Sequence, residues 1–166
     1  MGNSDTKTIG IGEFDVIREK GERIKTYALG SCVAVVIFCP RTDTVGMVHI
    51  ALPSSSIDPV KGEKLPGYFA NTAIPTLIKK MRMAGCVSPL REFTAKITGG
   101  ATMVHFSGSR FNIGERNTKE IIEICNKVRI KIIASETGGT INRTVTAASG
   151  SKSILINNPS IGSWEL

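Results

Sequence analysis

Residues 33–52 read VAVVIFCPRTDTVGMVHIAL, and this stretch decides the fold. Its first part, Val33–Phe38, is an unbroken run of apolar and mostly β-branched residues, which is typical of a buried strand. Pro40–Thr44 contains turn-forming residues, and Gly46–Leu52 is apolar again until Pro53 ends it. The stretch therefore predicts a β-hairpin whose two strands are buried.

The segments around this hairpin predict more strands and two helices. Thr72–Ala84 carries apolar residues at helical spacing, and Pro75 fits this helix only in its first turn, with Asn71 or Thr72 as the N-cap. Glu115–Lys127 has an apolar stripe and predicts the second helix. Strands are expected at residues 14–18, 24–27, 93–98, 130–134, 141–147 and 154–157.

One domain over residues 1–166 is the simplest organisation, because the chain has no internal repeat and no long linker rich in Pro, Gly and Ser. About eight strands and two helices predict an α+β fold with mixed or antiparallel sheets. The core is expected over about residues 9–157. Residues 54–66 are polar and are expected to form a surface loop bordering a site, and residues 158–166 a loosely held tail.

The charge balance suits an acidic partner, since 21 Lys and Arg face 14 Asp and Glu and give a net charge of +7. The basic residues are scattered, however, and no basic tract is interleaved with aromatic residues, so nucleic-acid binding is not expected. No apolar run approaches the roughly 18 residues that span a bilayer, and no signal-peptide pattern is present. We therefore expect a cytoplasmic protein without membrane insertion.

The four cysteines predict neither a disulfide framework nor a zinc site, because they form no Cys-x-x-Cys pair and the chain has two histidines. No sequence has the spacing of a phosphate-binding loop either, so no metal or cofactor is expected. Cys39, Cys86 and Cys125 are interpreted as packing residues, since free cysteine is among the most buried residue types. His105 lies in a glycine-flanked segment and is interpreted as a surface residue.

Cys32 and His49 are the residues best placed for chemistry. Cys32 follows Gly30 and Ser31 at the start of a buried strand, where a sharp turn can expose the thiol and aim backbone N–H groups at one point. His49 is the one polar side chain in an apolar strand, and burying it is unfavourable without a hydrogen-bond partner. Each has a structural alternative: a small core residue for Cys32, and a core histidine bonded to a backbone carbonyl for His49.

The hairpin relates these two residues through its register. Closure of the turn between Cys39 and Thr44 places Ala34 opposite His49. Cys32 is then the diagonal neighbour of His49 on the same face, roughly 7 Å away between Cβ atoms. A shift of one residue would place the two side chains on opposite faces, and the sequence pattern leaves both registers open.

A cysteine beside a histidine can transfer acyl groups. A free thiol has a pKa of about 8.5 and is only slightly ionised at neutral pH, but an adjacent imidazole can accept its proton. Cys32 then attacks an acyl carbon, and His49 protonates the leaving amine and later activates water. Thr26 is the predicted partner that orients His49, and Gly30 and Ser31 are expected to shape the site and its oxyanion-binding N–H groups.

The chain resembles the CheD family in six segments, which occur in the order seen in that family from about residue 9 to residue 157. The segments are GIGE at 10–13, LGSCVAV at 29–35, GMVH at 46–49 with Leu52-Pro53, AKITGGA at 95–101, NIGERN at 112–117 and TGG at 137–139. The ordered set is specific, whereas no single segment is.

This resemblance implies a protein-glutamine glutaminase that converts glutamines of chemoreceptor cytoplasmic helices to glutamate, releasing ammonia, in chemotaxis adaptation. The catalytic cysteine, histidine and threonine of the family fall on Cys32, His49 and Thr26. The implied fold is a mixed β-sandwich flanked by helices, similar to that of the cytotoxic necrotizing factor deamidases.

Two other functions stay open at this point. Some CheD proteins bind the phosphatase CheC, so a non-catalytic module that regulates CheC by docking is the main alternative to the deamidase. A cysteine protease or a transglutaminase shares the same thiol chemistry, but it would cleave or crosslink its substrate.

Overall fold

The hairpin predicted from residues 33–52 forms the centre of the structure. In the computed structural model, which describes residues 5–102 and 112–166, β4 (Val33–Phe38) pairs antiparallel with β5 (Val45–Ile50). The Cys39 N–H donates to the Thr44 carbonyl at 3.0 Å. Ala34 lies opposite His49. The predicted hairpin is therefore confirmed, and of the two registers left open the structure has the one that places Ala34 opposite His49.

Two five-stranded sheets pack face to face in the described ranges. The first sheet has the order β2-β5-β4-β6-β7 and the second the order β1-β3-β8-β9-β10. The pairs β1–β3 and β6–β7 are parallel and the others are antiparallel, so both sheets are mixed. The remaining strands are β1 (Thr6–Ile9), β2 (Phe14–Ile17), β3 (Arg23–Leu29), β6 (Thr94–Gly99), β7 (Lys131–Thr137), β8 (Arg143–Ala148), β9 (Ile154–Asn158) and β10 (Gly162–Glu165).

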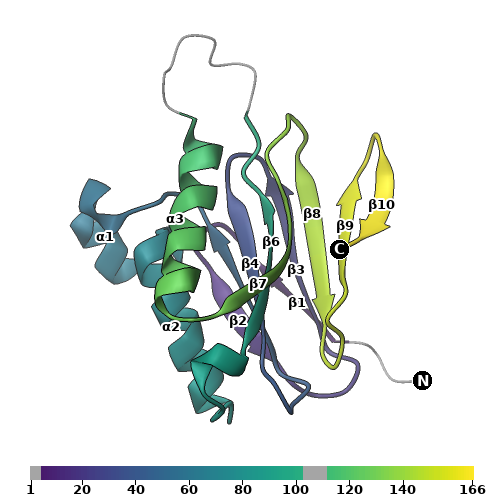
Figure 1. Ribbon diagram of the computed structural model, residues 1–166. Coiled ribbons are helices and arrows are strands. Elements are labelled where there is room, and N and C mark those ends of the chain that lie inside the picture. The colour runs from purple at the N-terminus through teal and green to yellow at the C-terminus, as the bar shows by residue number, and fades with distance from the viewer. Residues whose placement is uncertain (1–4, 103–111) are drawn as a thin grey trace.

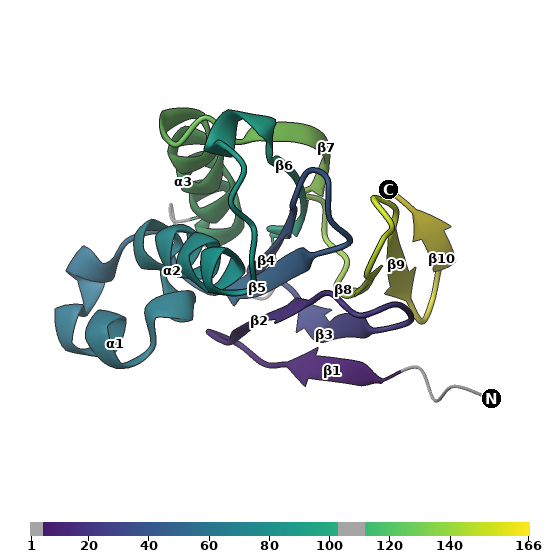
Figure 2. The ribbon, with the colours of Figure 1, turned by 90° about the horizontal axis from the view of Figure 1, so that it is seen from below.

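Helices cover the outer face of the first sheet, which gives three layers (Figures 1 and 2). The α-helices of the described ranges are α1 (Pro59–Lys64), α2 (Ala70–Met83) and α3 (Ile113–Lys127), with single 3-10 turns at Ser55–Ile57, Pro66–Tyr68 and Leu90–Glu92. The expected α+β sandwich flanked by helices is confirmed. Within residues 5–102 and 112–166, no helix has the length and apolar content needed to cross a membrane.

Strand β4 is buried on both faces because it lies in the middle layer. Alternate residues of a strand point to opposite faces. Val33, Val35 and Ile37 contact the helix-side core, whereas the residues between them contact the inter-sheet core. This double burial explains why β4 reads as a continuous apolar run instead of an alternating one.

The predicted start of the first long helix was wrong. Helix α2 begins at Ala70 with Phe69 as its N-cap, so Pro75 lies inside the helix and not in its first turn. Burial of Phe69 and Ala70, together with the Ala70 N–H bond to the Leu52 carbonyl at 2.9 Å, fixes the earlier start. Pro75 is exposed to solvent. Because proline has no N–H, one backbone carbonyl in the preceding turn lacks its helical hydrogen bond, and water can hydrate that carbonyl instead.

Two expectations about irregular segments were also wrong. Residues 54–66 contain a 3-10 turn and helix α1, whose N-cap Asp58 accepts the Lys61 N–H. The expected loose tail, residues 158–166, is held instead: β10 pairs with β9, and Leu166 exchanges two backbone bonds with Ile154. The pairing covers the edge of β9. His105 lies outside the described residues.

Candidate active site

A buried hydrogen bond joins the two sheets. Thr26 lies on β3 of the second sheet, and His49 lies on β5 of the first. The Thr26 Oγ1 and the His49 Nδ1 are 2.7 Å apart, and both residues are almost fully buried. The structure therefore brings together two of the predicted site residues that are 23 positions apart in the sequence.

The partners of Thr26 assign the tautomer of His49. The Thr26 hydroxyl donates its single hydrogen to the Ile9 carbonyl at 2.9 Å. Its oxygen must therefore accept the hydrogen of His49 Nδ1, and the lone pair of the neutral ring is on Nε2. In the described part of the chain, Nε2 has no hydrogen-bond partner. The ring is held by one nitrogen and can act as a base through the other.

The turn before β2 holds the backbone of His49. The Gly12 N–H donates to the His49 carbonyl at 2.8 Å, and the His49 N–H donates to the Glu13 carbonyl at 3.1 Å. Gly12 has a φ of 79°, a left-handed conformation that favours glycine. The N-terminal segment thus fixes the strand position of the histidine, a role that the sequence pattern alone did not assign.

An irregularity in β3 precedes the segment that carries Cys32. Between Thr26 and Leu29 the pairing of β3 with β8 shifts its register, and Ala28 has a φ of 56°. Such a β-bulge redirects a strand, and a non-glycine residue in this conformation costs energy. The bulge separates the buried Thr26 from residues 30–32, which connect the second sheet to the first.

Backbone bonds from the segment after β6 hold residues 30–32. The Ala101 N–H donates to the Gly30 carbonyl, and the Gly100 N–H donates to the Cys32 carbonyl, both at 2.8 Å. A Cβ atom at Gly99 would lie only 2.3 Å from the Cys32 carbonyl oxygen. The Gly99-Gly100 pair therefore allows a close approach of two backbones.

Cys32 and His49 share the inter-sheet face. Cys32 precedes Ala34 by two residues, Ala34 lies opposite His49, and the half-buried Cys32 packs against the inter-sheet core. Met47, two residues before His49, belongs to the same core. The register that would place Cys32 and His49 on opposite faces of the sheet is therefore excluded.

Burial keeps both groups neutral near pH 7. It raises the pKa of the Cys32 thiol, an effect that the N–H of Cys32 itself partly offsets. Burial also lowers the pKa of His49 to about 4. A preformed thiolate–imidazolium pair is therefore unfavourable, and the thiol proton must move when a substrate is attacked.

Comparison with known proteins places these features in a family. A family model described as CheD chemotactic sensory transduction matches residues 51–158, which is more than half of the chain. The chain belongs to the CheD family.

Relatives within the CheD family align over nearly the full chain. The probable chemoreceptor glutamine deamidase CheD of Syntrophotalea carbinolica is 39% identical over 158 residues, covering 95% of this chain and 97% of the relative. The chemoreceptor glutamine deamidase CheD of Thermotoga maritima is 39% identical over 139 residues, covering 84% and 83%. Among solved structures, a Neisseria meningitidis protein of the DUF152 family is 9% identical with a TM-score of 0.48, covering 88% of this chain and 76% of that protein.

The other cysteines of this CheD chain have structural positions. Cys39, Cys86 and Cys125 are free and buried in the helix-side core. Burial raises the pKa of Cys86 and of Cys125 to about 11. Cys32 is the most exposed of the four thiols, which agrees with the interpretation of the other three as packing residues.

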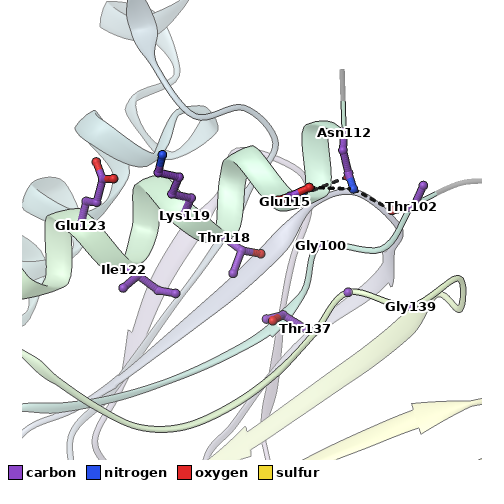
Figure 3. Close-up of a pocket in the computed structure, with 11 residues that line it drawn as sticks. Gly100, Thr102, Asn112, Glu115, Thr118, Lys119, Ile122, Glu123, Thr137 and Gly139 are labelled. Carbon is purple, nitrogen blue, oxygen red and sulfur yellow. Dashed lines mark hydrogen bonds between the residues drawn. The ribbon is translucent and has the colours of Figure 1, made fainter. Parts of the chain in front are cut away.

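A separate cavity of about 620 Å³ lies between α3 and the ends of β6 and β7 (Figure 3). Gly100, whose N–H holds the Cys32 carbonyl, is part of its wall. Neither Cys32 nor His49 is among the described residues that line it, so the cavity meets the site only through the backbone of Gly100. Its described lining residues are Gly100, Thr102, Asn112, Glu115, Thr118, Lys119, Ile122, Glu123, Thr137, Gly138 and Gly139.

Proposed function

We propose that this CheD family protein is a cytoplasmic glutamine deamidase that hydrolyses side-chain carboxamides of chemoreceptor helices, with Cys32 as the nucleophile. The observation that carries the proposal is the buried His49, which shares the inter-sheet face with Cys32. Its Nδ1 is fixed by Thr26, and its Nε2 has no hydrogen-bond partner among the described residues. The names of the relatives support the substrate class.

The first half of the reaction forms a thioester. The Cys32 sulfur attacks the carboxamide carbon of glutamine while its proton moves to His49 Nε2, and the carbonyl oxygen becomes an oxyanion. Because both groups are neutral at rest, this proton transfer accompanies formation of the C–S bond. His49 then gives the proton to the departing nitrogen, and ammonia leaves as the C–N bond breaks.

The second half releases glutamate. A water molecule attacks the thioester carbon and gives a proton to His49 Nε2, the C–S bond breaks, and the proton returns to the Cys32 sulfur. The net reaction is glutamine plus water to glutamate plus ammonia. Throughout, the Thr26 hydroxyl keeps the hydrogen on Nδ1, so Nε2 alone exchanges protons.

Intact mass of a chemoreceptor cytoplasmic fragment tests the proposal. Each deamidation replaces an amide by an acid and adds about one dalton, whereas proteolysis or crosslinking changes the mass far more. We expect wild-type protein to give this increase and to release ammonia, and Cys32→Ala and His49→Ala to give neither. Cys39→Ala, at the opposite end of β4, is the matched control and retains activity. Undiminished turnover by Cys32→Ala would exclude the mechanism.

The half-buried position and raised pKa of the Cys32 thiol favour one alternative, a binding module that regulates the phosphatase CheC with a closed site. Docking leaves the mass of every partner unchanged. A wild-type protein that binds CheC but leaves the receptor fragment unchanged in mass would support this alternative against the deamidase.

A further inference from the structure

Asn117 connects the segment just before β4 with the residue just after β5, next to Cys32 and His49. It is fully buried on α3, and its Nδ2 donates to the Ser31 carbonyl at 3.1 Å and to the Ala51 carbonyl at 2.9 Å. Ser31 directly precedes Cys32, and Ala51 follows His49 by two residues. Both amide hydrogens of one side chain therefore hold the backbone of the nucleophile and of the base.

The orientation of this amide is determined by its two acceptors. Both facing groups are carbonyl oxygens, so the reversed orientation would set Oδ1 against them without a hydrogen. In the orientation observed, Oδ1 is buried and has no hydrogen-bond partner among the described residues. Burying an unpaired Oδ1 costs free energy, so an apolar side chain would fill this position at lower cost. The presence of an asparagine here therefore points to a role for its two Nδ2 hydrogen bonds.

Two glycines let α3 approach closely enough for these bonds. A Cβ atom at Gly114 would lie 2.3 Å from the Gly100 carbonyl oxygen, and one at Gly100 would lie 2.6 Å from the Thr118 hydroxyl. The first turn of α3 thus packs directly on the backbone that follows β6. Asn117 lies within this contact, one turn further along the helix.

The backbone carbonyls of residues 30–32, the segment that ends in Cys32, each accept a hydrogen bond. Those of Gly30 and Cys32 accept N–H groups from the segment after β6, and that of Ser31 accepts from Asn117. In a trans peptide the N–H points opposite to the C=O. Holding the Ser31 carbonyl toward α3 therefore turns the N–H of Cys32 away from the helix. That N–H lies beside the Cys32 sulfur, whose pKa it lowers.

We infer that Asn117 is a positioning residue, which orients the Ser31–Cys32 peptide so that the Cys32 N–H donates to the oxyanion of the bound carboxamide. This inference rests on the proposed deamidase function. The second bond, to Ala51, ties the same peptide to the strand of His49, so one side chain sets the distance between oxyanion donor and base. Asn117 itself does not touch the reacting atoms.

Asn117→Leu tests the inference, because leucine has a similar size and cannot hold the Ser31 carbonyl. Removing one oxyanion donor typically costs about 10²-fold in kcat, so we expect a loss of that order with KM changed less than about twofold. Alkylation of Cys32 by iodoacetamide develops no oxyanion, so its rate should stay within about threefold of wild type. Asn126→Leu, on the exposed side of α3, is the control and leaves both rates unchanged.

The outcomes separate this inference from the proposed function. A wild-type protein that does not deamidate the receptor fragment would remove the function itself. Active wild type with an equally active Asn117→Leu would overturn the role of Asn117 alone, as would a parallel loss of alkylation and turnover. If the leucine variant does not fold, Asn117→Ala is measured in the same way. Failure of both variants to fold would assign Asn117 to stability and overturn the inference.

Discussion

The hydroxyl of Thr26 decides which ring nitrogen of His49 carries the hydrogen. Its own hydrogen bonds to the Ile9 carbonyl, so its oxygen can only accept from Nδ1. In the opposite tautomer, Nε2 would carry the hydrogen and could not accept a proton. The proposed mechanism therefore depends on a main-chain carbonyl on β1 as much as on the side chains that the sequence singled out.

Replacing Thr26 with valine should impair proton transfer without emptying the core. Valine has a similar shape but no oxygen, so the hydrogen on Nδ1 loses its acceptor and the base tautomer loses its preference. We expect kcat for release of ammonia to fall about 10²-fold, the typical contribution of general acid–base catalysis. Thr26→Ser keeps the oxygen and should retain most of the activity. Equal activity of the valine and serine variants would contradict the role of this bond.

The pH profile of kcat/KM should show the lowered pKa of His49. The base must be neutral to accept the thiol proton, and burial lowers its pKa to about 4. We therefore expect kcat/KM to stay level as the pH falls from neutral and to decline only near pH 4, with folding followed by circular dichroism. A decline centred near the ordinary histidine pKa of about 6.5 would show an exposed or ion-paired imidazole instead.

At the level of helices and strands, the sequence predicted those features that depend on the residue pattern within one short segment. The hairpin itself followed from its apolar runs and turn residues, but the sequence pattern leaves its register open, and the bond between Cys39 and Thr44 seen in the structure fixes it. The start of α2 did not follow, because burial of Phe69 outweighed the unfavourable position of Pro75. Asn117 was missed as well. It lies on the buried stripe with Gly114, the same kind of polar exception that identified His49.

The contact between α3 and the segment after β6 depends on Gly114. An alanine Cβ would lie 2.3 Å from the carbonyl oxygen of Gly100, and a backbone atom cannot move aside as a flexible side chain can. We expect Gly114→Ala to lower the free energy of unfolding by about 2–3 kcal/mol and to reduce deamidation, because α3 must move away from Ser31.

Urea denaturation measures the stability change, and Asn126→Ala on the exposed side of α3 should change it by less than about 0.5 kcal/mol. Wild-type stability together with full activity in Gly114→Ala would show that the helix can shift without affecting the site.

At the scale of the whole molecule, the sequence did not show which strand joins which sheet. Phe14–Ile17 and Arg23–Leu29 follow each other around a turn, yet β2 pairs with β5 and β3 pairs with β1 and β8. Periodicity reports which face of a strand is buried but not its neighbours. The bond between Thr26 and His49 crosses from one sheet to the other, so their contact became visible only when the layers were assembled.

The same buried histidine links the stability of the molecule to pH. The unfolded imidazole titrates near 6.5 and the folded one near 4, so between these values the unfolded chain binds more protons. Stability from this group is therefore complete above about pH 6.5 and is lost progressively as the pH falls to 4. This difference between the unfolded and folded pKa of His49 corresponds to about 3 kcal/mol in the free energy of unfolding.

Urea denaturation of wild type and His49→Gln at pH 7 and at pH 4.5 measures this linkage. Other titrating groups contribute equally to both proteins and cancel in the difference. We expect the wild type to lose more stability than the variant between the two pH values, because glutamine does not titrate. Parallel losses would mean that the folded ring accepts a proton as readily as the unfolded one. The neutral, buried base on which the proposed deamidase mechanism depends would then not exist.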